Sequence, residues 1–241
     1  MNKRSMTAVC LLVLALGSPT AGQEQSPAAR EAPPAADLLF VKLTLYPTAS
    51  LSRYDHNTDV DLYEIRAYAD VRLNSPEGRI VTDARITVLS QELAFKDDRY
   101  ENRIVVDKDA LPLEADFEIA LGERSVFGEK IPLLTWLVLQ APRPAMLAPG
   151  KDLAIRWEFS RFAAPVDVHA YDFLKGGEFF EREHTAETES VVPAAGVPAG
   201  TTLRIFVIQS WLSKRFLRGE GLARGSEVNV IPWSQVFVRT K

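Results

Sequence analysis

The sequence predicts an all-β protein made of two tandem antiparallel β-sandwiches. Apolar and polar side chains alternate along many short stretches, which is typical of strands that bury one face. The clearest stretch is residues 63–73, where every second residue is apolar and Glu64, Arg66 and Asp70 lie between them. Turn-forming residues separate these stretches, and no long stretch carries the 3.6-residue apolar period of an amphipathic helix.

The first sandwich is expected over residues 37–140. Its expected strands cover residues 39–45, 63–73, 84–88 and 117–119. The segment from Asn74 to Gly78 also contains Ser and Pro, and this composition favours a turn between two strands. Short strands separated by such turns are typical of antiparallel sandwiches.

The second sandwich is expected over residues 141–241. Pro142, Pro144 and Pro149 mark a junction, because proline cannot donate a hydrogen bond to a sheet. Net charge also changes here, from −8 over residues 23–140 to +2 over residues 141–241. A change of composition in a proline-rich segment supports a domain boundary. The later strands are expected within residues 153–159, 166–170, 203–207, 228–230 and 236–238, and Trp157 is expected in their core.

Two parts of the chain resemble known β-sandwich families. Residues 81–88, Tyr100 and residues 117–121 resemble the first domain of exported bacterial proteins with tandem immunoglobulin-like domains. Residues 149–157 and 200–207 are similar to fibronectin type III and related sandwiches. The resemblance implies an architecture that serves adhesion, ligand display and spacing alike. The immunoglobulin Cys-Trp-Cys pattern is absent, so the resemblance concerns architecture and not chemistry.

The first 22 residues have the pattern of a secretory signal peptide. A charged start is followed by an apolar run over residues 8–16 and then by small residues. The run is too short to span a bilayer, and we expect no transmembrane segment elsewhere. Cleavage before Gln23 is expected, with cleavage after Ala21 as the alternative. The protein is therefore expected to be exported, either periplasmic or secreted, with residues 23–36 forming a flexible Pro/Ala-rich tether.

The chain contains one cysteine, Cys10, which lies inside the apolar run. A lipid anchor on Cys10 is an alternative, but the preceding residues lack the usual Leu-x-Gly/Ala pattern. The exported chain would have no disulfide framework, so its stability must come from core burial.

A candidate calcium loop precedes residues 63–73. Oxygen-bearing side chains recur at every second position, a spacing that calcium loops use: Asp55, Asn57, Asp59 and Asp61. An EF-hand would have glycine where this chain has Val60 and a bidentate Glu where it has Arg66. We therefore expect weak calcium binding at most, and a solvated loop with turn-forming Asp and Asn is the alternative.

Histidine is scarce, and the expected strand at residues 166–170 carries His169. Asp167, His169 and Tyr171 should share the polar face of that strand. A metal site with His184 or an acid–base role for His169 is one interpretation. The other, which is more typical of antiparallel sheets, is a solvated face without chemistry.

Residues 211–218 combine aromatic and basic side chains. The candidate partner-contact residues are Trp211, Lys214, Arg215, Phe216 and Arg218. An exposed segment of this kind suits an anionic partner or membrane surface. The alternative is that its apolar residues pack beneath a connection between two strands. Basic residues are too few here for nucleic-acid binding.

No nucleophile motif, zinc motif or glycine-rich phosphate loop occurs in the sequence. The pattern therefore favours a non-catalytic exported binding or structural module, which presents loops or sheet faces to a protein or glycan of the cell envelope and requires no cofactor. The alternative is a hydrolase of envelope polymers that uses carboxylates or His169 in a cleft. Convergence of such residues in one concave pocket would favour the hydrolase.

Overall fold

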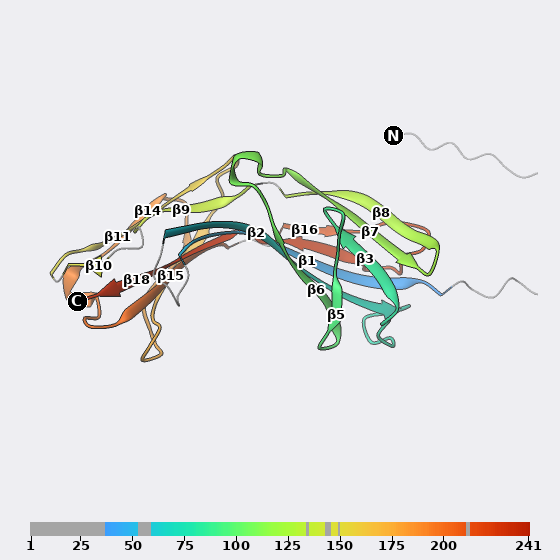
Figure 1. Cartoon of the computed structure of the whole chain (residues 1–241), viewed down its shortest axis with the longest axis horizontal. Coiled ribbons are helices and arrows are strands. Elements are labelled where there is room, and N and C mark those ends of the chain that lie inside the picture. Colours follow the sequence, from blue (N-terminus) through green and yellow to red (C-terminus); the bar gives the residue numbers. More distant parts are fainter. Residues whose placement is uncertain (1–36, 53–58, 134, 143–145, 149, 211–212) are drawn as a thin grey trace, which may run out of the picture. The chain divides into compact units, whose positions relative to one another are not determined.

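The computed structural model describes residues 37–241 except residues 53–58, 134, 143–145, 149 and 211–212. These residues belong to one compact unit, residues 36–241, which is shown in Figure 1. The described part contains strands and two single 3₁₀ turns, η1 (Lys108–Ala110) and η2 (Ala194–Gly196), and no α-helix. The all-β prediction is confirmed. No described helix is long and apolar enough to cross a membrane.

The largest sheet has eleven strands, and its main path follows the order β13-β12-β15-β18-β1-β2-β6-β5. The strands of this path are β13 (Glu178–Thr185), β12 (Val166–Asp172), β15 (Thr202–Gln209), β18 (Trp233–Thr240), β1 (Leu39–Ser52), β2 (Asp59–Leu73), β6 (Arg99–Val105) and β5 (Ala94–Lys96). Three strands lie off this path: β10 (Met146–Leu147), β16 (Ser213–Phe216) and β17 (Glu227–Val230). The sheet joins strands from both halves of the chain.

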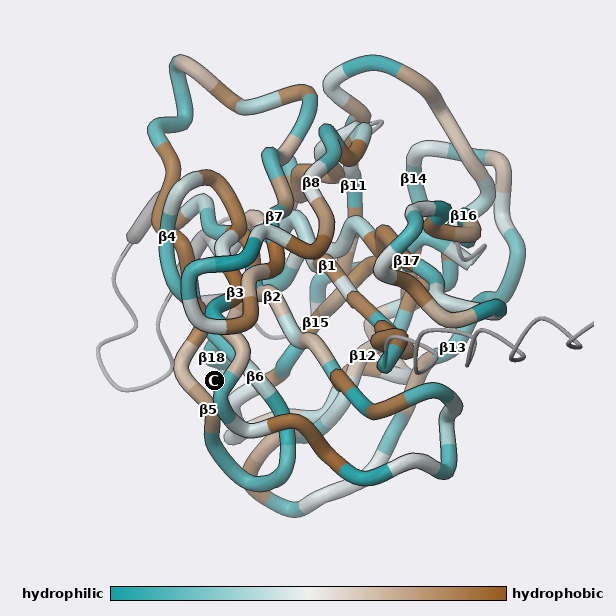
Figure 2. The backbone as a smooth tube through the Cα atoms, turned by 90° about the vertical axis from the view of Figure 1, so that its right-hand side faces the viewer, coloured by the Kyte–Doolittle hydropathy of each residue, from teal (hydrophilic) through white to brown (hydrophobic). Residues whose placement is uncertain are grey.

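Two smaller sheets complete the described fold. One has four strands in the order β4-β3-β7-β8: β4 (Gln91–Glu92), β3 (Ala84–Val88), β7 (Glu114–Leu121) and β8 (Arg124–Pro132). The other has three strands in the order β14-β11-β9: β14 (Glu189–Val192), β11 (Leu153–Phe159) and β9 (Leu137–Ala141). Figure 2 shows hydrophobic and hydrophilic segments following one another along the chain, as expected for strands that bury one face.

The first hydrophobic core brings together the large sheet and the four-stranded sheet. On β1, Leu39, Val41, Leu43 and Leu45 are fully buried, whereas the residues between them face the other way. Buried residues of β3, β7 and β8 belong to the same cluster, among them the large ring of Phe117. The alternation in the sequence therefore correctly identifies the buried face of these strands.

The second core brings together the large sheet and the three-stranded sheet. Leu153, Ile155 and Trp157 on β11 are buried against Val166 and other residues of β12, β15 and β18. Trp157 is only 2% exposed, which confirms its predicted core position. Its indole Nε1 has no hydrogen-bond partner among the described residues.

The last two strands of the chain, β17 and β18, lie beside its first strand, β1. β1 pairs in parallel with β17 and, further along, with β18. Ser226 reinforces this junction: its buried hydroxyl oxygen accepts a hydrogen bond from the Val41 N–H at 3.0 Å and donates to the Ala223 carbonyl at 2.9 Å. Late residues join the first core: Leu217, Leu222, Val228 and Val230. The division into two sandwiches, over residues 37–140 and 141–241, stays a prediction. The large sheet contains strands from both ranges.

Candidate functional site

The face of the large sheet opposite its two cores carries a cavity of about 470 Å³. Strands from both halves of the chain contribute to it, because β15 and β18 from one half adjoin β1 and β2 from the other. The lining side chains are Thr44, Tyr46, Arg66, Tyr68, Arg99, Arg204, Phe206, Ile208 and Trp233. We call this set the arginine–aromatic trough.

Each arginine of the trough lies over an aromatic ring. The guanidinium carbon of Arg66 is 5.0 Å from the centre of the Trp233 ring, and that of Arg99 is 4.5 Å from the Tyr68 ring. Arg204 lies 5.3 Å from the Phe206 ring. The attraction between a cation and the electron-rich ring face holds each guanidinium near its ring. A guanidinium held in this way keeps N–H groups that can donate to an anion.

The three arginines differ in their polar partners. Arg66 Nε donates to Glu64 at 2.5 Å, and Arg99 donates to Glu101 at 3.1 and 3.2 Å. Arg204 Nε donates to the neutral amide oxygen of Gln235 at 3.3 Å, and no carboxylate among the described residues pairs with it. Burial, and secondly the charge of Arg66, lower the pKa of Arg204. An anion in the trough would stabilise the charged form of Arg204 and offset the repulsion from Arg66.

A second cavity of about 320 Å³ shares Arg204 and Phe206 with the trough. It extends toward the turn that joins β12 to β13, where Asp172 and Gly176 line it. A hydrogen bond from the Thr201 hydroxyl at 2.6 Å is the main cause that lowers the pKa of Asp172. The Leu174 and Lys175 backbone N–H groups also donate to this carboxylate, so it holds the turn rather than contributing a free base.

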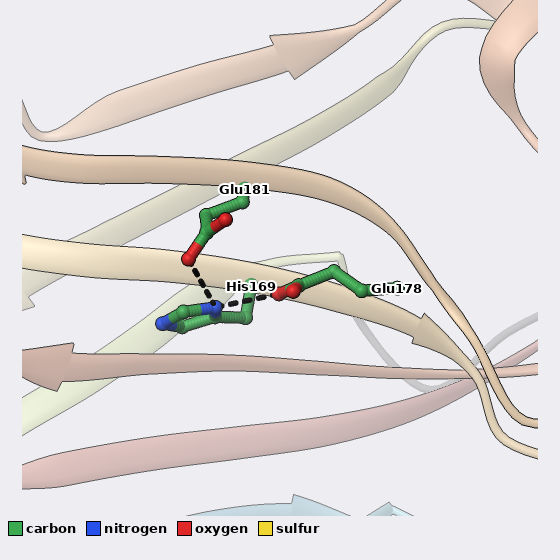
Figure 3. Close-up of side chains that lie close together, drawn as sticks. All are labelled: His169, Glu178 and Glu181. Atoms are coloured by element: carbon green, nitrogen blue, oxygen red, sulfur yellow. Dashed lines mark hydrogen bonds and ion pairs between the residues drawn. The ribbon is translucent and has the colours of Figure 1, made fainter.

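Beside this region, His169 on β12 meets two carboxylates of β13, as Figure 3 shows. His169 Nδ1 lies 2.6 Å from Glu178 Oε1 and 3.7 Å from Glu181 Oε1. The imidazole stacks on the Phe206 ring, with ring centres 4.7 Å apart, and lies nearly parallel to the Tyr171 ring at 6.1 Å. Packing against these rings restricts how the imidazole can turn.

The structure confirms that Asp167, His169 and Tyr171 lie on the face of β12 opposite its buried residues, but it does not bring His169 and His184 together. His184 Nδ1 instead lies 3.0 Å from Asp167 Oδ1. Burial acts to raise the pKa of Asp167, but hydrogen bonds from the His184 backbone N–H, the Ser210 hydroxyl and the His184 ring lower it overall. Among the described residues, the group of side chains that could hold a metal ion contains His169 but not His184.

The candidate calcium loop falls largely outside the described residues. Asp55 and Asn57 lie in an undescribed segment. Asp59 and Asp61 belong to the start of β2, but the structure gives no account of their side chains. Weak calcium binding at this loop stays a prediction.

Of the predicted partner-contact residues, Lys214, Arg215 and Phe216 lie on β16, Arg218 follows that strand, and Trp211 lies outside the described residues. Phe216 is 59% exposed and Arg218 is also exposed, whereas Leu217 is buried in the first core. Lys214 pairs with Glu227 and lies over the Phe216 ring, and Arg215 pairs with Glu129 at 2.8 Å. Two of the three basic side chains of this segment, Lys214 and Arg215, are therefore already paired with acidic side chains of the protein.

Sequence reasoning missed most residues of the trough and the acidic partners of His169. The acidic partners of His169 could have been found from the sequence, because Gly176 and Gly177 favour a turn that would pair the following strand with β12. In that hairpin His169 pairs with Glu181 and Tyr171 with Glu178. The trough had no such signal, since its strands come from distant parts of the chain.

A third cavity, of about 570 Å³, contains a pair of acidic residues. Glu114 and Asp116 on β7 line it, together with Lys130, Arg161 and the exposed ring of Phe162. Both acidic side chains are exposed. A carboxylic acid that donates a proton near neutral pH typically lies in an apolar pocket instead.

No protein-family model matches the chain, and no curated protein matches it. Among solved structures, the chain is similar to a mutant of Salmonella alpha-2-macroglobulin, with 12% sequence identity and a TM-score of 0.27. The match covers 88% of this chain and 15% of that chain, so this chain spans a small part of that protein.

Proposed function

We propose that the protein is a non-catalytic, exported binding module that holds acidic groups of a protein or glycan partner in the arginine–aromatic trough. The main observation that supports this proposal is that one cavity contains three arginines, each of which lies over an aromatic ring. The signal-peptide pattern of residues 1–22 supports export, either to the periplasm or beyond the cell.

Arg204 is the residue most suited to bind the partner's anion. Its guanidinium is half-buried and stacked, and its hydrogen bond goes to a neutral amide. A carboxylate or phosphate can accept two parallel N–H bonds from such a group. Arg66 and Arg99 would add positive potential along the same face, although Glu64 and Glu101 neutralise part of it.

The trough suits an elongated ligand. It crosses β15, β18, β1 and β2, and adjacent strands are about 4.8 Å apart. The second cavity extends the same surface beyond Arg204 and Phe206. A chain with repeated acidic groups, either an acidic glycan or an acidic peptide, could contact several of these side chains together.

Calorimetric titration of the purified protein tests this proposal with an oligogalacturonate, a glutamate-rich peptide and a neutral maltodextrin. We expect at least one acidic probe to bind, with an affinity that falls as salt is raised. Arg204→Gln should abolish most of this binding. Arg218→Gln is the matched control, because it removes the same charge from an exposed position away from the trough.

Three outcomes would contradict the proposal: neither acidic probe binds at millimolar concentration, maltodextrin binds equally well, or Arg204→Gln binds like the parent. A loss caused by Arg218→Gln instead would assign the contact to the segment that follows β16.

A hydrolase remains the alternative function, and the carboxylates of Glu114 and Asp116 in the third cavity are the observation that favours it. Residues two apart on a strand point to the same side, so both could face one substrate. Release of soluble fragments from peptidoglycan by the parent, and its loss in Glu114→Gln and Asp116→Asn, would support this function. The absence of release would leave the binding module as the better account.

A further inference from the structure

We propose that His169, Glu178 and Glu181 form a binding site for a divalent transition-metal ion, for which Zn²⁺ is the probe. This site lies on β12 and β13, does not depend on the proposed function, and would be independent of the predicted calcium loop. The main observation that supports this site is that one imidazole nitrogen and one oxygen from each carboxylate all lie within 4.8 Å of one another.

The distances are close to those that a bound ion requires. Zinc binds nitrogen and oxygen ligands at about 2.1 Å, so two ligands of a tetrahedral site lie about 3.4 Å apart. The separation of 3.7 Å between His169 Nδ1 and Glu181 already meets this requirement. The separation of 2.6 Å to Glu178 must widen by roughly 0.8 Å. Both glutamates are exposed, so their side chains can make this adjustment.

The charge of the cluster also favours a cation. Glu178 and Glu181 converge on one imidazole, and no Lys or Arg of the described residues forms an ion pair with either carboxylate. A divalent ion would compensate the two negative charges that meet at this imidazole.

The surroundings hold the ligands in place. The ring centres of Phe206 and Tyr171 lie 4.7 Å and 6.1 Å from that of the imidazole, so packing restricts how the His169 ring can turn. The donor set of one nitrogen and two carboxylates suits Zn²⁺ better than Ca²⁺ or Mg²⁺, which prefer oxygen ligands alone.

Metal binding requires a lone pair on Nδ1. When neutral His169 carries its proton on Nδ1, the ring must change to the tautomer with the proton on Nε2; when the ring is charged, one proton leaves to solvent. The two carboxylates bind in their ionised form. Three protein ligands leave the fourth tetrahedral position for water.

Calorimetric titration with Zn²⁺ near neutral pH tests the site on a Cys10→Ser background, because a thiolate is also a zinc ligand. We expect one site with micromolar affinity. His169→Ala and the double variant Glu178→Gln/Glu181→Gln should each weaken binding by at least about tenfold, as expected when a ligand or its support is lost. Ca²⁺ should not compete at the same concentration.

His184→Ala is the matched control, because His184 lies on the same hairpin with one carboxylate, Asp167, as its partner. It should bind Zn²⁺ like the parent. The Nδ1 resonance of His169 should shift on titration in nitrogen-15 spectra. Absent zinc binding below millimolar concentration would overturn the proposal. Unchanged affinity in the double glutamine variant, or equal loss in His184→Ala, would overturn it as well. Melting temperatures of all variants separate loss of the site from loss of the fold.

Discussion

Arg204 lies over the ring of Phe206, its neighbour two residues along β15, at 5.3 Å from the ring centre. Residues two apart on a strand share a face, so this stack is built into the strand itself. The centre of the Phe206 ring also lies 4.7 Å from that of the His169 ring. Phe206 is thus the common contact of the trough and the histidine cluster.

Arg204→Lys should weaken binding of an acidic probe although it keeps the positive charge. Lysine lacks the planar group that stacks on Phe206 and donates two parallel hydrogen bonds. A charged hydrogen bond contributes about 1.5 to 3 kcal/mol, so the dissociation constant should rise about tenfold or more. Titration of both proteins with oligogalacturonate measures this difference. Equal affinity would mean that Arg204 acts through charge alone.

Trp157→Ala should destabilise the protein by about 3 to 5 kcal/mol, because the residue is fully packed in the second core. Trp157→Phe should cost much less, since the indole N–H that it removes has no acceptor among the described residues. Urea unfolding of both variants provides the measurement. A Trp157→Ala variant as stable as the parent would disagree with the packing described above.

Ser226→Ala should cost about 1 to 3 kcal/mol, because it leaves the buried N–H of Val41 without its acceptor. Ser125→Ala is a suitable control, since Ser125 is exposed on β8. Comparing urea midpoints of the two variants measures the contribution of the hydroxyl group. Similar midpoints would indicate that solvent or another group replaces it.

Asp172→Asn should be less stable than the parent near neutral pH, and the difference should shrink as the solution is acidified. The folded state lowers the pKa of Asp172, chiefly through the Thr201 hydroxyl. Its stabilising effect is therefore present above the ordinary aspartate pKa of about 4 and disappears as pH falls through the lower pKa of the folded protein. Thermal melts between pH 7 and pH 2 measure the difference, and a constant gap would contradict this assignment.

Millimolar calcium should raise the melting temperature of the parent little. The loop at residues 55–61 provides three carboxylates and one amide but no closing bidentate glutamate. Tight binding to the native state would increase its stability through mass action. A rise of several degrees that disappears with a chelator and in Asp59→Ala would establish a real calcium site there.

Alternation along each strand sufficed to predict the all-β class and the buried positions of Leu43 and Trp157, because burial of one face imposes a two-residue period. Alternation does not indicate which strands pair with one another in a sheet. Lys42 pairs with Glu227 across a parallel ladder, and no local turn or spacing indicates a pairing over such a sequence distance. The trough depends on those pairings, so its residues could not be grouped from the sequence.

The parallel pairing of β1 with β17 also has a consequence for synthesis. Leu43 lies opposite Val228, so the strand made first gains this neighbour only when the chain is almost complete. Until then the edge of β1 that pairs with β17 lacks these backbone hydrogen-bond partners. Contacts between such distant residues slow folding, because a long loop must close before they form. A ribosome-bound chain that ends at residue 216 should therefore stay open to protease, whereas the released chain should resist it.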